Sequence, residues 1–512
     1  MNYNTPPRFL ITADWIFPVT APAIKGGGLV INGEKIEAVV DAEALAFLKE
    51  SEPELAYRHY KNAAVLPGLI NLHTHLDYSN LAHLSDFDGP GMFDWLESLV
   101  ELSRSQLNGP EALVASALSG AREAALAGTS YIVDSTFSGA SALALAQVGL
   151  KGLVGLELFG LDESCADFLF GLWESRLQAL QITLQETLKK TEDEVLAATK
   201  IDSQHGDATA AGGIAITRTN ERLNSLYSKT QPISVEFLKQ PPQTTPKIRL
   251  TIAPHAPYTV SPALWAKAKN WAQERHLPLT CHLAESENEH NWIAGEDDRL
   301  HQYLLKVMPK NPQLNTDEAM AIFLKSLDWK GRGASPVEHL QNNSLLNKDT
   351  IAAHCLKASE KDIAILAEAG VKIALCPRSN RILKNGIPNS RAYEKSGVTF
   401  GLGTDSRASS PNLDLRDEAR LLELSQERLL ALLTIEAAKA VGLEDSIGSL
   451  AAGKCADLAV FDIGSLSTKE TSTDVSEHLS AEAALADIFE QRNPCRLLLV
   501  DGRAVVSAGQ LN

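Results

Sequence analysis

The segment Val65–Leu81 reads VLPGLINLHTHLDYSNL and decides how the rest of the chain is interpreted. Its apolar run turns at Pro67-Gly68, continues, and ends in His73 and His75, which lie one residue apart. Side chains alternate along a strand, so both imidazoles point the same way and can bind one ion together. A buried imidazole also occurs as a hydrogen-bonded core residue, so the pair alone leaves both interpretations open.

Length and charge limit the classes of protein to consider. The 512 residues suit one large domain with a smaller one, or two to four ordinary domains. Asp and Glu number 64 against 47 Lys and Arg, a formal charge of −17, which argues against nucleic-acid or anionic-membrane binding as the main activity. No signal peptide or membrane-spanning segment is visible, and the six cysteines show no CxxC spacing. These features predict a cytoplasmic protein.

The two ends of the chain share a β-strand character. FLITADWIFPV and GGLVINGEKIEAVVD open the chain, and AGKCADLAVFDI and CRLLLVDGRAVVSAG close it. Asn32-Gly33 and Asp501-Gly502 are typical of two-residue hairpin turns. We therefore expect a small discontinuous β-sandwich domain built from both termini.

The middle of the chain alternates short β-branched apolar runs with helical patterns, which predicts parallel strands and an α/β fold. Eight candidate strands suggest a (β/α)₈ TIM-like barrel: Val65–His73, Thr129–Asp134, Gly152–Leu158, Ile248–Ala253, Leu277–His282, Thr350–His354, Val371–Cys376 and Val398–Gly403. The predicted domains are residues 1–64 and 436–512 for the β-sandwich and 65–435 for the barrel. A Gly-, Gln-, Thr- and Pro-rich stretch at about 188–246 is predicted to be an insertion.

Polar residues lie where several candidate strands end. In a barrel of this kind, the catalytic residues lie at the rim formed by the C-terminal ends of the strands. They are His73 and His75 on the first strand, His255 after the fourth, His282 and Glu285 at the fifth, His354 at the sixth and Asp405 after the eighth. Singly, each has an ordinary explanation: a core histidine, a helix start or a turn. Their shared position favours one site. Imidazoles with one carboxylate suit Zn²⁺ or Fe²⁺ rather than Ca²⁺ or Mg²⁺.

Six motifs in this order resemble the amidohydrolase superfamily, in its ATZ/TRZ-like branch of nucleoside and N-heterocycle deaminases and triazine hydrolases: LPGLINLHTHLD, APHAPYTVSP, CHLAES, AHC, CPRSN and GLGTDS. The resemblance implies one divalent transition metal, Zn with Fe as the alternative, held by His73, His75, His282 and Asp405. It implies that Glu285 transfers a proton to a ring nitrogen and that His354 orients or deprotonates the attacking water. Asp405, as a metal ligand, is expected to accept the proton of that water.

The substrate-binding residues follow from the same resemblance. His255 matches a substrate-contacting residue, and CPRSNRILKNG is similar to a loop of deaminases acting on adenine nucleosides. In that loop Arg378 is expected to bind a substrate carboxylate, and Asn380 is expected to serve either the ligand or the local structure. The expected function is a metal-dependent hydrolase of non-peptide carbon–nitrogen bonds that deaminates an adenine-type nucleoside or related N-heterocycle. Alternatives are a triazine-type chlorohydrolase or aminohydrolase and a non-catalytic barrel scaffold. The expected partner is a small N-heterocyclic substrate, with a homodimer expected by analogy alone.

Overall fold

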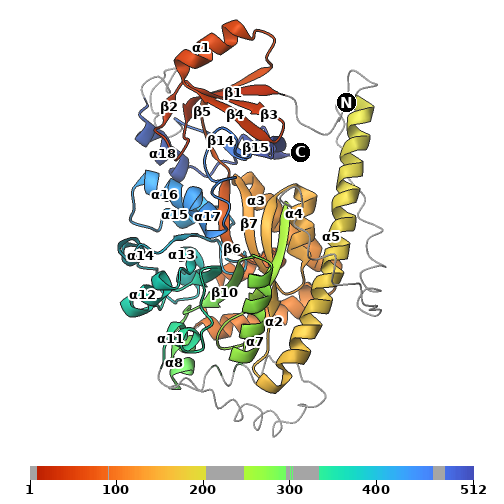
Figure 1. Cartoon of the computed structure of the whole chain (residues 1–512), viewed down its shortest axis with the longest axis vertical. Helices are drawn as coiled ribbons and strands as arrows, with labels where there is room; N and C mark the ends of the chain where they lie inside the picture. The colour runs from red at the N-terminus through yellow and green to blue at the C-terminus, as the bar shows by residue number, and fades with distance from the viewer. Residues whose placement is uncertain are drawn as a thin grey trace.

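The computed structural model describes residues 8–89, 91–202, 247–295, 300, 303, 334–464 and 479–512. Of the predicted insertion, residues 203–246 lie outside the described residues, whereas residues 188–202 continue helix α5 (Ala166–Asp202). A β domain lies at the top of Figure 1 and a larger α/β domain lies below it. None of the described helices is long and apolar enough to cross a membrane.

Eight parallel strands form the larger domain, in two hydrogen-bonded groups of four. They are β6 (Leu69–Thr74), β7 (Thr129–Thr136), β8 (Lys151–Leu158) and β9 (Ile248–Pro254), then β10 (Leu279–Leu283), β11 (Thr350–His354), β12 (Lys372–Leu375) and β13 (Phe400–Leu402). At the two joins, β9 contacts β10 and β13 contacts β6. The His282 N–H donates to the His255 carbonyl at 2.7 Å, and the Asp405 N–H donates to the His73 carbonyl at 3.0 Å. The strands therefore close into the predicted (β/α)₈ barrel.

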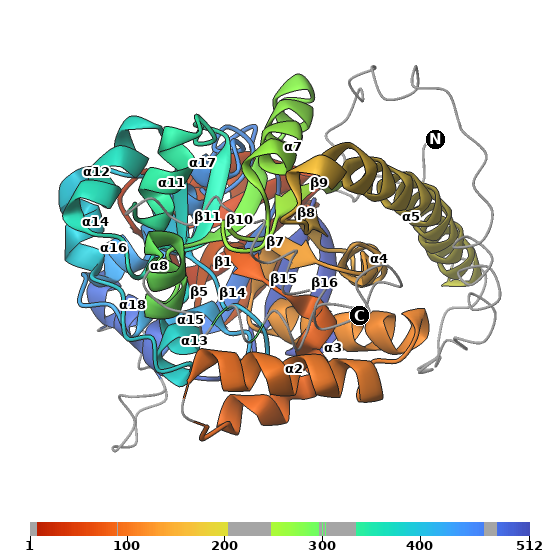
Figure 2. The same cartoon turned by 90° about the horizontal axis from the view of Figure 1, so that it is seen from below.

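Helices surround these strands, as the view from below in Figure 2 shows. The described helices are α1 (Ala42–Ser51), α2 (Met92–Gln106), α3 (Pro110–Leu126), α4 (Ala140–Val148), α5, α7 (Pro262–Glu274), α8 (Glu287–Ala294), α11 (Pro336–Asn342), α12 (Glu360–Glu368), α13 (Pro377–Ile382), α14 (Ser390–Ser396), α15 (Leu415–Ala419), α16 (Gln426–Leu433), α17 (Ile435–Ala440) and α18 (Ala481–Glu490), with 3₁₀ helices η1 (Leu76–Asp86) and η2 (Glu163–Cys165). Several begin at a serine whose hydroxyl accepts a backbone N–H, among them Ser261 before α7 and Ser359 before α12. Such caps fix where each helix leaves the preceding strand.

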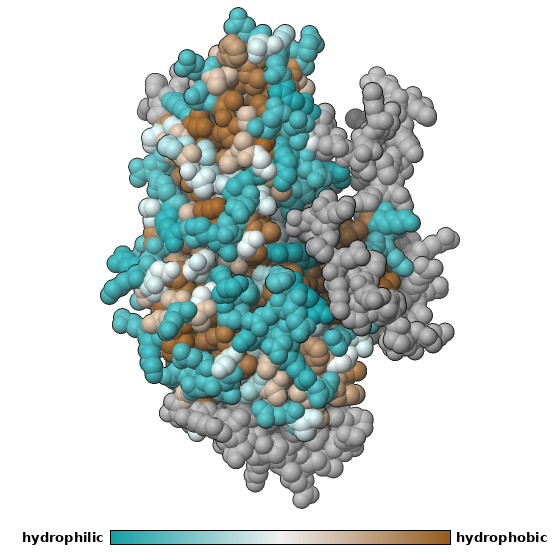
Figure 3. Space-filling view, viewed as in Figure 1, coloured by the Kyte–Doolittle hydropathy of each residue, from teal (hydrophilic) through white to brown (hydrophobic). Residues whose placement is uncertain are grey.

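The β domain is one sheet of nine strands drawn from both ends of the chain. In the order β17-β16-β15-β14-β5-β1-β3-β4, with β2 beside β1, they are β17 (Gln510–Leu511), β16 (Arg503–Ser507), β15 (Leu497–Val500), β14 (Leu458–Asp462), β5 (Tyr57–Pro67), β1 (Phe9–Ile16), β3 (Gly28–Asn32), β4 (Lys35–Val40) and β2 (Ile24–Lys25). Ile11, Ile36, Val460 and Leu499 share one core, so the sheet folds over itself. Figure 3 shows a brown, hydrophobic area at the top of the molecule, where this domain lies.

The first predicted strand, Val65–His73, is divided between the two domains, which corrects the prediction. Its residues up to Pro67 end β5 in the nine-stranded sheet, and β6 begins at Leu69 in the barrel. Between them the Gly68 N–H donates to the Asp457 carbonyl at 3.0 Å. A Cβ at Gly68 would lie 2.3 Å from Ser130 Oγ, so the crossing requires glycine.

Candidate active site

His73 and His75 enter the site from the end of β6. His73 lies on the strand, and its backbone N–H donates to Asn71 Oδ1 at 3.2 Å. The two rings lie edge to face with centroids 4.9 Å apart. Both side chains are buried, so the strand brings two imidazoles to one point, as the HxH spacing predicts.

His282, His354 and Asp405 meet this pair from the other half of the barrel. His75 Nε2 lies 3.0 Å from His282 Nε2, and Asp405 Oδ1 lies 3.8 Å from Nε2 of both His73 and His75. One ligand atom each from His73, His75 and Asp405 lies within 4.8 Å of the others, and the same holds for His73, His282 and His354. Five residues from four strand ends therefore form one histidine–aspartate cluster.

The chemistry of these donors fits a divalent transition metal. Burial lowers the pKa of His73 and of His282 well below the ordinary histidine value, so both rings are neutral and carry a lone pair. His282 Nδ1 lies 3.0 Å from the His255 carbonyl, which places its proton there and leaves Nε2 free. Nε2 of His73 is buried and has no hydrogen-bond partner among the described residues. Neutral imidazoles around one carboxylate are the donor set that such an ion prefers.

Asp405 is held in an ionised form by its surroundings. Burial acts to raise its pKa, but the facing histidines and the Ser379 hydroxyl outweigh burial and leave the pKa at about 2. Ser409 Oγ donates to Oδ2 at 3.0 Å, and the Ser406 N–H donates to Oδ1 at 2.8 Å. The residue has a φ of 55°, in the left-handed region, where strain is kept at functional positions.

Glu285 and His354 face each other beside the cluster. Glu285 Oε1 lies 3.8 Å from His354 Nε2, and both side chains are buried. Burial, with a further contribution from Asp405, raises the pKa of Glu285 to about 8, so this carboxyl keeps its proton at neutral pH. The arrangement joins a proton donor to a neutral imidazole, which suits acid–base chemistry.

Asn380 and His255 lie next to the residues of the cluster. Asn380 Oδ1 lies 3.0 Å from His354 Nδ1, so it accepts the ring proton there and leaves Nε2 as an acceptor. The His255 ring packs against that of His282 with centroids 4.7 Å apart, and its Nδ1 lies 2.8 Å from the Thr259 hydroxyl. The structure thus places both beside the cluster, while a contact of either with substrate stays a prediction.

Arg378 does not lie free in the site, which corrects its prediction as a substrate contact. The side chain is only 4% exposed. All five of its side-chain N–H donors are directed at protein oxygens of Glu418, Asp417, Asp414 and Asn412. No donor is left for a substrate carboxylate, so Arg378 anchors the start of α13 to α15.

Comparison of the sequence with a family profile supports the same site. The profile described as "Amidohydrolase family" matches residues 64–505, which includes every residue of the cluster. The chain belongs to the amidohydrolase family. It therefore belongs to a family of hydrolases that act on carbon–nitrogen bonds.

Relatives of this amidohydrolase share its length. Proteins named 5-methylthioadenosine/S-adenosylhomocysteine deaminase from Bacillus cereus and Bacillus anthracis are 25% and 26% identical, over 95% of this chain and 91% of theirs. Three solved structures share the fold. They are a zinc-bound adenosine deaminase of Xanthomonas campestris (21% identity, 99% and 95% of the two chains, TM-score 0.66), the Helicobacter pylori aminofutalosine deaminase with methylthio-coformycin (18%, 97% and 100%, 0.67) and the zinc-bound atrazine chlorohydrolase of Arthrobacter aurescens (18%, 98% and 96%, 0.64).

Two acidic residues of this amidohydrolase site were missed by sequence reasoning. Glu289 accepts the backbone N–H of Glu285 at 2.8 Å and that of Ala284 at 3.1 Å, so it holds the turn that presents Glu285. Glu157, near the end of β8, brings a carboxylate oxygen within 4.8 Å of a ring nitrogen of both His75 and His282. A lone acidic residue in the apolar strand KGLVGLEL is the signal that could have identified Glu157.

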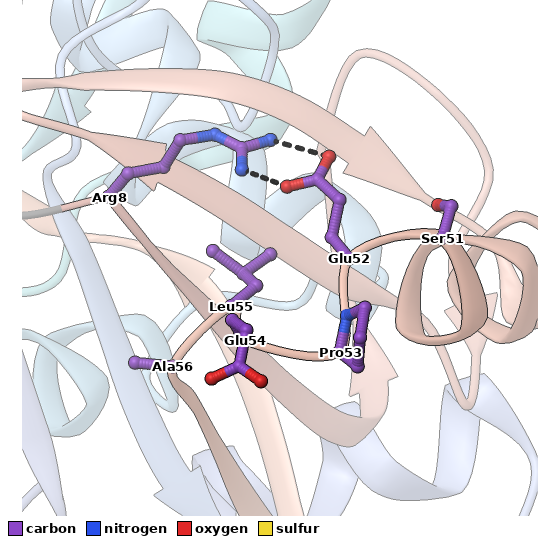
Figure 4. A pocket seen from close by; sticks show the side chains of 7 residues that line it. All are labelled: Arg8, Ser51, Glu52, Pro53, Glu54, Leu55 and Ala56. Atoms are coloured by element: carbon purple, nitrogen blue, oxygen red, sulfur yellow. Dashed lines mark hydrogen bonds and ion pairs between the residues drawn. The ribbon is translucent and has the colours of Figure 1, made fainter.

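A surface hollow in the β domain is separate from this chemistry. Figure 4 shows it lined by Arg8, Glu52, Leu55 and their neighbours. Arg8 donates to both carboxylate oxygens of Glu52 there. The lining residues include none of the cluster.

Proposed function

We propose that this amidohydrolase hydrolytically deaminates an adenine-type nucleoside or a related N-heterocycle, with Zn²⁺ as its metal. The observation that carries the proposal is the placement of Glu285 opposite His354, 3.8 Å away, beside the histidine–aspartate cluster. Hydrolysis of an amino-substituted ring needs a proton for the ring nitrogen next to the attacked carbon, and a buried carboxyl can supply it. The deaminase names of the relatives support the same reaction class.

His73, His75, His282 and Asp405 are the residues proposed to hold the ion. When bound, a zinc ion lowers the pKa of water to about 7 and so supplies a nucleophile at neutral pH. Hydrogen bonds orient two of these side chains. The Ser409 hydroxyl and the Ser406 N–H donate to the Asp405 carboxylate, and the His255 carbonyl faces Nδ1 of His282. This fixed outer shell is what keeps ligands in position.

The remaining side chains are proposed to move protons. His354, with its Nδ1 proton on Asn380, accepts a hydrogen bond from the attacking water through Nε2 and directs it at the amino-bearing carbon. Glu285 gives its proton to the adjacent ring nitrogen. Asp405 takes a proton from the water and returns it to the departing amino group, which leaves as ammonia. As the carbonyl forms where the substrate carried the amino group, the second proton of the former water passes to Glu285 and restores its carboxyl, so the protons balance.

The proposal extends to the setting of the enzyme. The partner is a small-molecule substrate that enters at the rim formed by the strand ends. The six cysteines are all free, and the net charge is −17, features that support a reduced cytoplasmic location.

Ammonia release from zinc-loaded enzyme tests this function. A panel of adenosine, 5′-methylthioadenosine, a pterin and a chloro-alkylamino-triazine should show ammonia release strongest for an adenine nucleoside, and Glu285→Gln should reduce that release to a small residual rate. Exposed Glu163 offers a control, since Glu163→Gln should leave the rate unchanged. Release of chloride or an alkylamine from triazines without ammonia from any nucleoside would overturn the proposal.

A further inference from the structure

The join between β6 and β13 carries three of the four proposed metal ligands. His73 and His75 lie in and just after β6, and Asp405 follows β13. Among the described strands, β6 pairs with β7 and β13 pairs with β12, and no strand ladder joins β6 to β13. The positions of these ligands relative to one another therefore depend on other contacts across the join.

Asn71 spans this join from β6. Its side chain is fully buried, and its Oδ1 accepts the His73 N–H and the Thr404 N–H, each at 3.2 Å. Its Nδ2 donates to Thr404 Oγ1 at 2.8 Å. A buried backbone N–H needs an acceptor, and one amide oxygen has two lone pairs. Asn71 therefore supplies the acceptor that strand pairing would otherwise provide.

The same contacts continue to the backbone of Asp405. Thr404 Oγ1 donates to the Asp405 carbonyl at 3.2 Å, and Thr74 Oγ1 donates to it at 2.8 Å. The Asp405 N–H in turn donates to the His73 carbonyl. Asp405 has the left-handed φ described above, a conformation that costs energy and persists only where neighbouring groups hold it. The hydroxyls of Thr404 and Thr74 are such groups.

The two strands approach each other so closely here that a side chain has no room at Gly403. A Cβ at this glycine would lie 2.7 Å from the His73 carbonyl oxygen and 2.8 Å from the His73 nitrogen. Tightly packed contacts transmit displacement rather than absorb it. A change at Asn71 or Thr404 should therefore move His73 and Asp405, which lie one or two residues further along each strand.

We propose that Asn71 and Thr404 are positioning residues that set the spacing of the metal ligands across the join of β6 and β13. We call this pair the Asn71–Thr404 bridge. It acts through the backbones of His73 and Asp405 and touches neither the ion nor the reacting atoms. The inference rests on the proposed zinc site and adds residues outside the ligand set that determine how tightly this site binds its ion.

Zinc affinity measured on the whole chain tests the inference. Metal-free wild type, Asn71→Ala, Thr404→Val and the double variant are titrated with Zn²⁺ against a chelating indicator. We expect each single variant to raise the zinc Kd by about 10- to 100-fold, the usual effect of removing a residue that orients metal ligands. The double variant should raise it by much less than the product of the two single effects, because each change breaks the same bridge.

Two further variants separate positioning from stability. Thr404→Ser keeps the hydroxyl and should bind zinc as tightly as wild type. Thr12 in β1 is equally buried, and its hydroxyl lies 2.9 Å from His59 Nδ1, so Thr12→Val is the matched control. It should lower stability, measured by thermal unfolding, without changing the zinc Kd.

Co²⁺ in place of Zn²⁺ adds a spectroscopic readout of the ligand geometry. The visible absorption bands should shift in Asn71→Ala and Thr404→Val and stay unchanged in Thr12→Val and Thr404→Ser. If Asn71→Ala does not fold, the comparison of Thr404→Val with Thr404→Ser decides.

The possible results separate this inference from the proposed function. An unchanged zinc Kd and cobalt spectrum in folded Asn71→Ala and Thr404→Val, with a loss of stability alone, would make the join a structural contact only and overturn the proposal. Equal loss of affinity in Thr404→Ser and Thr404→Val, or fully additive effects in the double variant, would overturn the bridge as well. If wild type itself binds no zinc, the proposed zinc site fails and the inference falls with it.

Discussion

At the residue scale, the proposed ligands and the proton-handling residues of this amidohydrolase are held in different ways. His73 presents a buried Nε2 that has no partner among the described residues. His354 instead has its Nδ1 on Asn380 and its Nε2 facing Glu285. Removal of these two imidazoles should therefore have different consequences.

We expect His73→Ala to lose both bound metal and activity, because it removes a donor at the centre of the cluster. His354→Ala should keep most of its metal while kcat falls by roughly 100- to 10,000-fold, the usual contribution of a positioned acid or base. Metal analysis of the purified proteins, beside ammonia release, measures both. Exposed His59 provides the control, and full metal content in His73→Ala would show that this histidine is only a core residue.

The pH dependence of kcat/KM should report the ionisation of Glu285. Burial raises its pKa to about 8, so the protonated form that can donate to a ring nitrogen predominates below that pH. We expect kcat/KM to hold up to about pH 8 and to fall as the pH rises further. The fall should be absent from the residual activity of Glu285→Gln, which cannot ionise. An unchanged alkaline limb in that variant would assign the ionisation to another group.

Positions at strand ends could be predicted from the sequence, but the partners of Arg378 could not. His73, His282 and Asp405 follow short apolar runs, and a parallel barrel brings such ends to one rim. The oxygens that occupy Arg378 belong to residues 34 to 40 positions further along the chain. No local pattern indicates that contact, so an arginine in a loop motif looked free.

At the element scale, helix α13 positions the proposed catalytic imidazole of His354. Its Asn380 is buried and meets His354 through Oδ1. Asn380→Ala should lower kcat by roughly 10- to 100-fold and shift the pH profile, because His354 loses the acceptor that fixes its tautomer. KM should change little, and steady-state kinetics across pH measures both quantities.

Asn385, in the turn just after α13, serves as the matched control, since its amide contacts Met92 rather than the cluster. A raised KM with unchanged kcat and pH profile in Asn380→Ala would instead place Asn380 against the substrate. That result would favour the role predicted from the sequence.

Turn chemistry explains which elements could be predicted. In the hairpin of β15 and β16, Asp501 and Gly502 both have positive φ, as an Asp-Gly turn of this length requires. The division of Val65–His73 was missed because the apolar run continues through Gly68 without a change in composition. Its cause is the approach of Ser130 and Asp457 from other strands, which periodicity cannot indicate.

At the scale of the whole molecule, a buried ion pair joins the barrel to the β domain. Lys151 Nζ, at the start of β8, donates to Asp457 at 2.9 and 3.0 Å and also to Asp501. Lys151→Met should reduce the free energy of unfolding by about 3–5 kcal/mol, because two carboxylates lose their buried cation. Chemical or thermal unfolding followed by circular dichroism measures the change.

Lys348, paired with Asp349 at the surface, is the matched control. Lys348→Met should change the free energy of unfolding by no more than about 0.5 kcal/mol. Equal stability of the two variants would mean that the buried pair does not hold the domains together.

The pairing of β5 with β14 has a consequence for how the protein is made. These neighbours lie about 390 residues apart in the chain, since Pro67 pairs with Leu458. At roughly 5–20 residues per second of synthesis, β5 leaves the ribosome about 20–80 s before its partner exists. During that interval its edge offers unpaired backbone groups to any other strand in the cell. The nascent chain should therefore depend on chaperones until β14 emerges, and truncations that remove the chain from Leu458 onward should aggregate rather than yield a free barrel.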